Sequence, residues 1–460
     1  MSDTNAPITM LHGWGRTAPS PARLLVPRSV DEVAAAVVAA AADPRGIIAR
    51  GLGRSYGDPA QNAGGTVLDM TGLARIHSID ADRGLVDVDA GVSLDTLMRA
   101  ALPYGLWLPV LPGTRQVTIG GAIGADIHGK AHHVVGSFGN HVRSFELVTA
   151  DGQVRTLTPE GSGDDPGGEL FWSTVGGMGL TGVITRATLA LHHVETAYFT
   201  VDTEQIDNLD ELMARQSEGD EHYAETVSWF DAVTTGTHFG RGILMRANHA
   251  RLTELPPKLR ADPLKFDAPQ LLTVPDVIPS GLLNRFTGKL FSEAWYRRSP
   301  TRFGAIQNIT QFLHPLDVLG EWNRGYGRRG FLQYQFVVPR ERADVIRTVL
   351  ERMTAARQVS ALNVLKRFGA GNRAPLSFPM PGWTLCVDIP INPGVGPLCD
   401  ELDEIVLGAG GRHYLAKESR TTPAAIRRGY PRLDEWRKIR DTADPHGVFV
   451  SDLARRLELV

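Results

Sequence analysis

The sequence predicts an α+β protein with two domains. The chain has 460 residues, of which 42% are hydrophobic, and this length exceeds that of the usual single domain. Residues 1–190 alternate strand-like and helix-like segments, and three glycine-rich clusters interrupt them. Residues 195–411 carry aromatic and alternating segments that are typical of an antiparallel sheet. We therefore expect a layered α+β domain and a second domain built on a sheet.

The first domain is expected to begin with a capped helix. Ser29 stands three residues before Glu32, which is a capping box, and an Ala- and Val-rich helix is predicted over 29–43. Apolar or alternating runs predict strands at 46–50, 67–70, 84–91 and 106–113, with a second helix at 93–105.

The three glycine clusters are GLGRSYGD (51–58), VTIGGAIGADIHG (117–129) and GGMGLTG (176–182). The first has the spacing G-x-G-x-x-x-G, and Pro59 follows where a Rossmann loop would open a helix, so this route to nicotinamide binding is disfavoured. Taken alone, the first cluster is as compatible with a tight turn as with a phosphate-binding loop. One extended, phosphate-bearing ligand that touches all three clusters explains them together.

The second part of the chain is expected to contribute a pocket. GFLQYQFVVP (330–339) and GWTLCVDIPI (382–391) read as strands, and Gln333 and Gln335 point to the same face of the first one. This pattern fits a pocket that binds sugar hydroxyls, but also an exposed sheet face with Tyr334 buried opposite.

Two further segments complete the prediction. The proline-rich stretch 262–302 lacks clean periodicity and is interpreted as a long, mobile excursion. In the tail, residues 434–457 predict a helix that stops at Asp444-Pro445, a turn at Gly447, and an apolar strand that rejoins the first domain.

Composition excludes several classes of function. The formal net charge of −3 provides no basic field for nucleic acid. Cys386 and Cys399 form no C-x-x-C pattern, and adjacent histidines such as His132 and His133 rarely converge on one ion, so neither disulfides nor a metal site are expected. The sequence shows no signal peptide and no apolar stretch long enough to span a membrane, which predicts a soluble protein without a classical export signal.

The motifs ARGLGRSYGD, PGTRQVTIGGAIGADIHGK, TVGGMGLTGVITRATL and DPHGVFVSDLARRL resemble those of the vanillyl-alcohol-oxidase type of FAD-binding flavoprotein. Together with HPLDVLGEWNRGYG, FLQYQFVVP, PGWTLCVDIPI and HYLAKESR, they resemble the branch of that family that oxidises decaprenylphosphoryl-beta-D-ribose. The resemblance implies an FAD-binding domain from residues 1–194 and 412–460. It also implies an inserted antiparallel-sheet substrate-binding domain over 195–411.

The activity implied by the resemblance is oxidation of the ribose C2 hydroxyl to the 2-keto sugar, the first half of epimerisation to decaprenylphosphoryl-arabinose for cell-wall arabinan. The implied partners are a polyprenyl-phosphate sugar, an NADH-dependent keto-sugar reductase, and the surface of the plasma membrane in the cell envelope. Two alternatives stay open: an alditol or aldonolactone oxidase on the same fold, and a non-catalytic nucleotide-binding scaffold.

The resemblance also implies the flavin-binding residues. Many relatives attach FAD covalently through a histidine of the first loop, but residues 50–59 contain none, so FAD is expected to bind non-covalently. The implied flavin contacts are Arg50, Gly51, Leu52, Gly53, Arg54, Ser55, Tyr56, Gly57, Asp58, Pro59, Gly113, Thr118, Ile119, Gly120, Gly121, Ala125, Asp126, Ile127, His128, Val183 and Tyr414.

Lys417 in HYLAKESR is the implied catalytic residue, placed to orient the substrate hydroxyl and stabilise charge; without the resemblance, a solvent-facing lysine is the ordinary expectation. The implied substrate contacts are Tyr56, His128, Lys130, Trp229, Gln333, Gln335, Lys366 and Cys386. Lys130 and Lys366 are expected to meet the phosphate as point charges. The apolar neighbours of Cys386 predict a buried inert thiol, whereas the resemblance places it at the pocket wall.

Two positions depart from the family pattern. Relatives carry Tyr where this chain has Leu313 and Asn where it has Thr384, and both positions are expected to border the pocket. The excursion mixes apolar residues with Lys289, Arg297 and Arg298, so it is expected either to touch the membrane and close over the polyprenyl tail or to be a disordered insertion.

Overall fold

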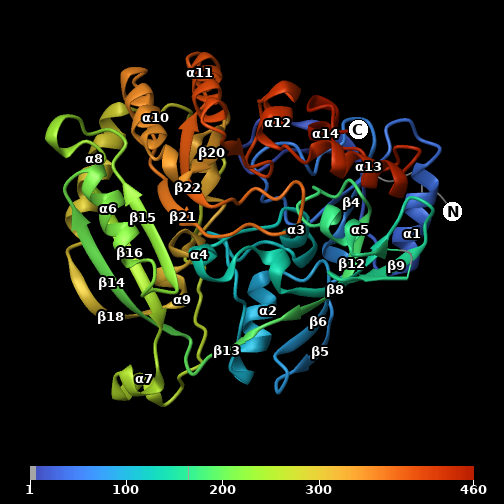
Figure 1. The fold of residues 1–460 in the computed structure, drawn as a ribbon, viewed down its shortest axis with the longest axis horizontal. Helices are drawn as coiled ribbons and strands as arrows, with labels where there is room; N and C mark the ends of the chain where they lie inside the picture. The colour runs from blue at the N-terminus through green and yellow to red at the C-terminus, as the bar shows by residue number, and fades with distance from the viewer. Residues whose placement is uncertain (1–6, 164) are drawn as a thin grey trace.

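The computed structural model describes residues 7–163 and 165–460, which include three sheets of four or more strands (Figure 1). The first sheet has the order β1 (Ile8–Leu11), β2 (Ser20–Leu25), β4 (Thr66–Asp69) and β3 (Ile47–Arg50). The pairs β2–β4 and β4–β3 are parallel. Helix α1 (Val30–Ala40) precedes β3, and the Ser29 side chain caps it by accepting from the Glu32 N–H.

The second sheet is antiparallel and has the order β5 (Ile76–Asp80), β6 (Leu85–Asp89), β12 (Val183–Ala190), β8 (Val142–Val148) and β9 (Val154–Leu157). Its strands share one apolar core with α2 (Leu94–Ala101) and α3 (Ile119–Gly124). This core supports the second glycine cluster, which contains α3.

The third sheet has eight strands and is antiparallel throughout. Its order is β18 (Arg302–Asn308), β14 (Tyr198–Ile206), β16 (Gly242–His249), β15 (Glu225–Phe230), β21 (Asn363–Phe368), β22 (Gly382–Pro390), β20 (Phe331–Pro339) and β23 (Arg412–His413). Its apolar face packs against helices α6 (Leu209–Gly219), α10 (Asp344–Ala355) and α11 (Val395–Gly408). The predicted antiparallel sheet is thereby confirmed.

Helix α1 and helix α14 (Asp452–Arg456), which are far apart in the sequence, lie on the same side of the molecule (Figure 1). After α13 (Leu433–Ala443), the Val448 carbonyl accepts from the Ile47 N–H at 2.8 Å, and the Val450 N–H donates back to the Ile47 carbonyl at 3.0 Å. The tail thus rejoins the first sheet as predicted, although by a single bridge rather than a strand. The exact domain boundaries stay a prediction.

The remaining elements are short strands and the helices that link the sheets. The strands are β7 (Leu106–Trp107), β10 (Gly161–Ser162), β11 (Asp165–Pro166), β13 (His192–His193), β17 (Leu272–Thr273) and β19 (Leu319–Gly320). The helices are α4 (His132–Val135), α5 (Glu169–Thr174), α7 (Pro257–Arg260), α8 (Arg285–Arg298), α9 (Ile309–Phe312), α12 (Pro423–Gly429) and α14 (Asp452–Arg456). No helix within 7–163 or 165–460 is long and apolar enough to cross a membrane.

Three local expectations differ from the structure. The strand expected over 106–113 is only Leu106–Trp107, because Pro109 and Pro112 remove backbone donors from the rest. The glycine cluster 117–129 contains helix α3, whose buried Ile119, Ala122 and Ile123 outweigh the low helix propensity of glycine.

The third difference lies in the excursion 262–302, which contains the 14-residue helix α8. Its N-terminus is capped by Asn284, whose side chain accepts from the N–H groups of Phe286 and Thr287. The prolines of the segment lie outside this helix, so they do not interrupt it.

Candidate active site

A cavity of about 460 Å³ lies where the glycine clusters meet the eight-stranded sheet. Gly51 and Gly53 of the first cluster, Gly120 and Gly121 of the second, and Gly179 of the third all border it. Its size is in the range of cofactor and ligand sites, which is roughly 300–1,000 Å³. The cavity therefore brings together the three clusters that the sequence associates with one ligand.

Close packing of the first cluster explains its glycines. A Cβ at Gly51 would lie 2.1 Å from Thr118 Oγ1, and a Cβ at Gly57 would lie 2.0 Å from the Glu418 carbonyl oxygen. Any larger residue at Gly51 or Gly57 would push the loop away from α3 or from the turn that carries Lys417. Glycine thus fixes the first loop against both neighbours.

The cavity wall has the features that an FAD site requires. A Cβ at Gly113 would meet no atom within 4 Å, so the backbone there faces open space. His128 Nδ1 is buried and has no hydrogen-bond partner within the part of the chain that the structure describes. A buried donor without a partner is costly, and a bound ligand would satisfy it. The residues present therefore fit a large cofactor.

Most of the predicted flavin contacts line this cavity. These are Arg50, Gly51, Leu52, Gly53, Arg54, Ser55, Tyr56, Pro59, Gly113, Thr118, Gly120, Gly121, Ala125, Ile127, His128 and Tyr414.

Five predicted flavin contacts do not line the cavity, because their side chains or backbone serve the surrounding structure. They are Gly57, Asp58, Ile119, Asp126 and Val183. Asp58 accepts from Arg456 at 2.8 and 3.0 Å. Asp126 accepts from Ser137, Ser377, Asn372 and the Gly139 N–H. Ile119 and Val183 have no exposed surface and pack in apolar cores.

Lys417 lies inside the cavity rather than in solvent. Its N–H donates to the Tyr414 carbonyl at 2.9 Å, and its Nζ lies 3.8 Å from the centroid of the Tyr56 ring. Burial lowers the pKa of Lys417 to about 8, although Cys386 and Asp388 act in the opposite direction. Because this value is near neutrality, the amine can gain or lose a proton under ordinary conditions.

Two amides of β20 face the cavity beside Lys417. Gln335 Nε2 donates to His128 Nε2 at 3.0 Å and lies 3.3 Å from Thr384 Oγ1, and Gln333 Nε2 donates to an Asp388 carboxylate oxygen at 2.6 Å. Both glutamines are buried, so the alternative of an exposed sheet face is wrong. Burial, with Lys366 nearby, holds the pKa of His128 well below its usual range, so its ring is neutral and accepts at Nε2.

Two lysines sit at another part of the cavity wall. Lys130 Nζ donates to the Phe312 carbonyl and lies 4.2 Å from the Phe312 ring centroid. Burial lowers the pKa of Lys130 to about 7 and that of Lys366 to about 8, while it raises the pKa of the nearby Glu225 to about 8. An anion brought into this site would favour the charged form of both lysines.

The other predicted contacts divide between the cavity and its surroundings. Cys386 is buried and lines the cavity, so both sequence-based expectations about its location hold; burial raises its thiol pKa to about 12. Leu313 also lines the cavity, whereas Trp229 does not, because its indole N–H is directed to the Ala361 carbonyl at 3.3 Å. Thr384 reaches the site only through Gln335.

Sequence reasoning placed only Leu313 of the segment 313–322 at the pocket, whereas most of this segment lines the cavity. The Arg115 N–H donates to Asp317 at 2.9 Å, and His314 Nε2 lies 3.1 Å from the Pro112 carbonyl oxygen, so this segment is fastened to the loop before the second glycine cluster. Sequence reasoning also missed Glu225 and Asp388, whose importance depends on their neighbours in space. The HPLDVLGEWNRGYG motif was the available signal for the segment 313–322.

Comparison with known proteins identifies the family. An FAD binding domain model matches residues 21–158, and a D-arabinono-1,4-lactone oxidase model matches residues 330–457. Decaprenylphosphoryl-beta-D-ribose oxidase of Mycolicibacterium smegmatis is 57% identical over 464 residues, which span 100% of both chains. This chain belongs to the decaprenylphosphoryl-beta-D-ribose oxidase family.

More distant relatives also match most of this decaprenylphosphoryl-beta-D-ribose oxidase family member. An uncharacterized Streptomyces coelicolor protein is 38% identical over 80% of this chain and 100% of its own. L-gulono-1,4-lactone dehydrogenase of Mycobacterium tuberculosis is 24% identical over 96% of this chain and 97% of its own. The chain is an FAD-dependent oxidoreductase with the two-domain fold of the vanillyl-alcohol-oxidase type.

Proposed function

We propose that this chain oxidises the C2 hydroxyl of decaprenylphosphoryl-beta-D-ribose to the 2-keto sugar, with FAD bound non-covalently. The full-length identity of 57% to an oxidase named for this substrate carries the proposal. The lactone enzymes, which represent the alternative of a soluble-sugar oxidase, are more distant at 24%. The reaction would be the first half of an epimerisation to decaprenylphosphoryl-arabinose for cell-wall arabinan, completed by a separate NADH-dependent reductase.

Lys417 is proposed to accept the hydroxyl proton. Oxidation of a secondary alcohol removes one hydride from carbon and one proton from oxygen, and FAD, when bound, supplies the hydride acceptor. With a pKa lowered to about 8, Lys417 offers a neutral amine at slightly alkaline pH. The buried amides of Gln333 and Gln335 flank this amine and are suited to hold the sugar hydroxyls.

The phosphate of the substrate is proposed to lie against Lys130 and Lys366. Both side chains are half-buried in the cavity wall, and the single negative charge of the substrate phosphodiester would compensate the cost of removing their positive charge from water. Leu313 and Leu316 line the same cavity and offer apolar contact to the start of the polyprenyl chain.

FAD is proposed to lie along the first loop, which would place backbone N–H groups of residues 50–59 at its pyrophosphate. Thr118, Gly120 and Gly121 would support the same ligand at the start of α3. Because residues 50–59 contain no histidine, the covalent link expected in many relatives cannot form there.

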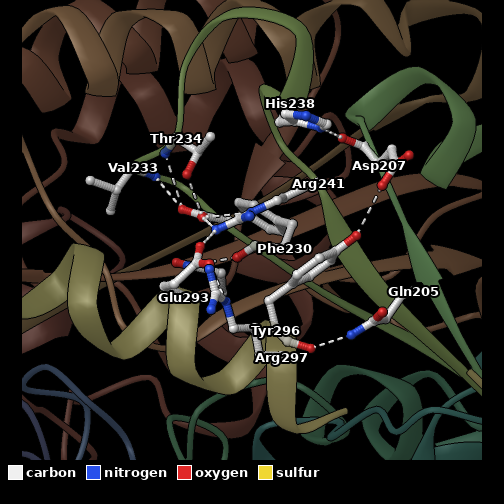
Figure 2. Close-up of polar contacts among 12 residues, drawn as sticks. Gln205, Asp207, Phe230, Val233, Thr234, His238, Arg241, Glu293, Tyr296 and Arg297 are labelled. Atoms are coloured by element: carbon white, nitrogen blue, oxygen red, sulfur yellow. Dashed lines mark hydrogen bonds and ion pairs between the residues drawn. The ribbon is translucent and has the colours of Figure 1, made fainter. Parts of the chain in front are cut away.

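Helix α8 and the residues before it are proposed to dock on the plasma membrane. Figure 2 shows polar contacts that hold α8 in place. Arg241 pairs with Glu293 of the helix at 2.5 Å, and the Tyr296 hydroxyl donates to Asp207 at 3.1 Å. The exposed surface of α8 carries the apolar residues Phe286, Leu290, Phe291 and Trp295, together with the basic residues Arg285, Lys289 and Arg298. Exposed apolar residues together with basic residues suit an anionic membrane surface.

The same segment continues to the cavity. Strand β17 pairs with β19, and both Gln270 and Gly320 border the cavity. Leu271 and Leu272 are exposed and directly follow Gln270 in the sequence, and we propose that they contact the lipid tail beside the cavity.

Anaerobic mixing of the purified enzyme with decaprenylphosphoryl-beta-D-ribose tests the proposed reaction. We expect loss of the oxidised flavin absorbance and formation of a 2-keto sugar in equal amount. Bleaching by free alditols or aldonolactones, with none by the lipid-linked sugar, would contradict the proposal. Protein that binds no flavin after reconstitution would instead favour the scaffold alternative.

Liposome co-sedimentation tests the membrane surface. The variant Phe286→Ser/Leu290→Ser/Trp295→Ser should lose most binding to anionic vesicles and turn over lipid-linked substrate more slowly. Ile8→Ser/Met10→Ser, which removes exposed apolar side chains of β1, serves as the control and should bind like the wild type. Equal binding by both variants would remove α8 from the proposal.

A further inference from the structure

Asp388 is a buried carboxylate directly behind the glutamines of the cavity. It lies on β22, has no exposed surface, and stands opposite Gln333 in the β20–β22 ladder. One carboxylate oxygen accepts from Gln333 Nε2 at 2.6 Å, and the other accepts from the Tyr326 hydroxyl at 3.2 Å. Its N–H donates to Ser360 Oγ at 2.9 Å. Asp388 itself does not border the cavity.

The charge of Asp388 has no contacting cation within the described part of the chain. Burying an unpaired carboxylate is unfavourable, and burial raises its pKa to about 7, whereas the bond from Gln333 and the charge of Lys417 lower it. A costly group of this kind, placed beside a catalytic candidate, calls for a role other than packing.

The ionisable groups around Asp388 are few. Lys417 acts on it from the turn after β23, Tyr326 donates to it from the segment 322–326, and Tyr56 and Cys386 both feel its charge. Lys417 is the sole group among these that is cationic at neutral pH. Lys417 is therefore the one cation among these groups whose charged form the negative charge of Asp388 favours.

We propose that Asp388 is a positioning residue for the oxidation, which fixes the amide of Gln333 and keeps Lys417 in its working protonation range without touching the substrate. This inference rests on the proposed role of Lys417.

The hydrogen bond to Asp388 determines how the Gln333 amide is oriented. An ionised carboxylate can only accept hydrogen bonds, so Gln333 must turn its NH₂ group toward Asp388. Its carbonyl oxygen then points away from the carboxylate and is left as an acceptor, and Gln333 lines the cavity. A sugar hydroxyl can donate to this oxygen.

The charge of Asp388 also affects the protonation of Lys417. Asp388 raises the pKa of Lys417, against the lowering by burial. Without this charge the amine would lose its proton at lower pH, and the pH at which the neutral amine becomes available would shift. Tyr56, whose ring centroid lies 3.8 Å from Lys417 Nζ, also feels the charge of Asp388.

The test compares Asp388→Asn with wild type in anaerobic single-turnover reactions over a range of pH. Substrate-dependent flavin bleaching in the wild type should rise with pH through a midpoint set by Lys417. In Asp388→Asn the midpoint should fall by about one pH unit, and the rate at high pH should drop on the order of tenfold because the Gln333 amide is no longer fixed. FAD content should be unchanged.

Asp403→Asn is the matched control, since Asp403 is a buried carboxylate that binds Tyr334 rather than a cavity residue. It should keep the wild-type midpoint. An unchanged midpoint and rate in Asp388→Asn would overturn the inference, as would an equal shift in the control. Gln333→Met supplies a second variant that keeps the charge: its rate should drop on the order of tenfold at an unshifted midpoint, and a wild-type rate would overturn the orienting role.

Binding provides a readout that is independent of turnover. Polyprenylphosphoryl-2-deoxyribose lacks the oxidisable hydroxyl, and calorimetry should show its affinity reduced on the order of tenfold by Asp388→Asn. Should the wild-type flavin be bleached by a free alditol and not by the lipid-linked ribose, the proposed substrate fails. The midpoint comparison, made with that alditol, then still decides the role of Asp388.

Discussion

Lys417 Nζ lies 3.8 Å from the centroid of the Tyr56 ring, although the two residues are far apart in the sequence. The Tyr56 N–H also donates to the Ala416 carbonyl at 2.8 Å, so the first glycine loop and the turn that carries Lys417 are joined by backbone as well as by side chain. The loop proposed to hold FAD and the lysine proposed to act on substrate are thereby fixed relative to each other. Their relationship underlies the predictions below.

Replacing Lys417 by Ala should leave the fold and FAD content intact but slow substrate-dependent flavin bleaching at least about 100-fold, the typical contribution of a general base. Lys438→Ala removes an exposed lysine of α13 and should bleach at the wild-type rate. Stopped-flow absorbance under anaerobic conditions provides the measurement. Full-speed bleaching by Lys417→Ala would exclude an essential role for this residue.

The pH dependence of the oxidation should follow the ionisation of Lys417. The folded-state pKa of Lys417 is lowered to about 8, so the neutral amine is scarce below this value and dominant above it. With substrate at saturation, so that Lys130 and Lys366 already hold the phosphate, we expect the rate of flavin bleaching to increase with pH and to level off above about 8. A profile that falls across this pH window would mean that the protonated lysine is the active form.

The lowered pKa of Lys417 also determines how this residue affects folding stability at different pH values. A lysine whose pKa is depressed in the folded state is less protonated there than in the unfolded chain, so burying Lys417 destabilises the fold most at low pH and less as pH rises. Urea unfolding of Lys417→Met should therefore show a gain in stability that is larger at pH 6 than at pH 9. Equal gains at both pH values would argue against a buried, depressed lysine.

The cavity thiol should be unreactive in the native state. Burial raises the pKa of Cys386 to about 12 and likewise that of Cys399, so neither forms appreciable thiolate at pH 8. A chromogenic disulfide reagent should react slowly with native protein and rapidly with both thiols after denaturation. Fast release of one equivalent from the native enzyme, absent in Cys386→Ser, would show that the cavity activates this thiol.

Gly51→Ala should weaken FAD binding, because the added Cβ would lie 2.1 Å from Thr118 Oγ1 and force the loop away from α3. We expect a stability loss of about 1–3 kcal/mol and a lower FAD content after gel filtration. Gly396→Ala is the control, since a Cβ there meets no atom within 4 Å. Wild-type FAD retention in Gly51→Ala would contradict the close packing of this loop.

Patterns with strong local signals were predicted well from the sequence. Residues 330–339 and 382–391 alternate and contain β-branched and aromatic side chains, and they form β20 and β22 almost to the residue. Asp444-Pro445 ends α13 as expected, since proline cannot continue a helix. Helix α3 was missed because three of its six residues are glycines, and its stability comes from tertiary packing of Ile119 and Ile123.

The site was predictable only in part for a related reason. The sequence around Lys417 contains no local pattern that predicts burial of this side chain. Only the family resemblance indicated that Lys417 belongs to the site. Asp388 and Glu225 acquire their roles from cross-strand neighbours, and Trp229 was placed at the cavity although its indole is occupied by Ala361. Such relations depend on strand register, which one sequence does not define.

The most direct test of the proposed reaction uses decaprenylphosphoryl-beta-D-ribose that carries deuterium at C2 of the ribose. In anaerobic single turnover, flavin bleaching should be slower than with the unlabelled substrate, and the product sugar should have lost the deuterium and become the 2-keto compound. Bleaching at an unchanged rate with the label retained in the sugar would contradict oxidation at C2.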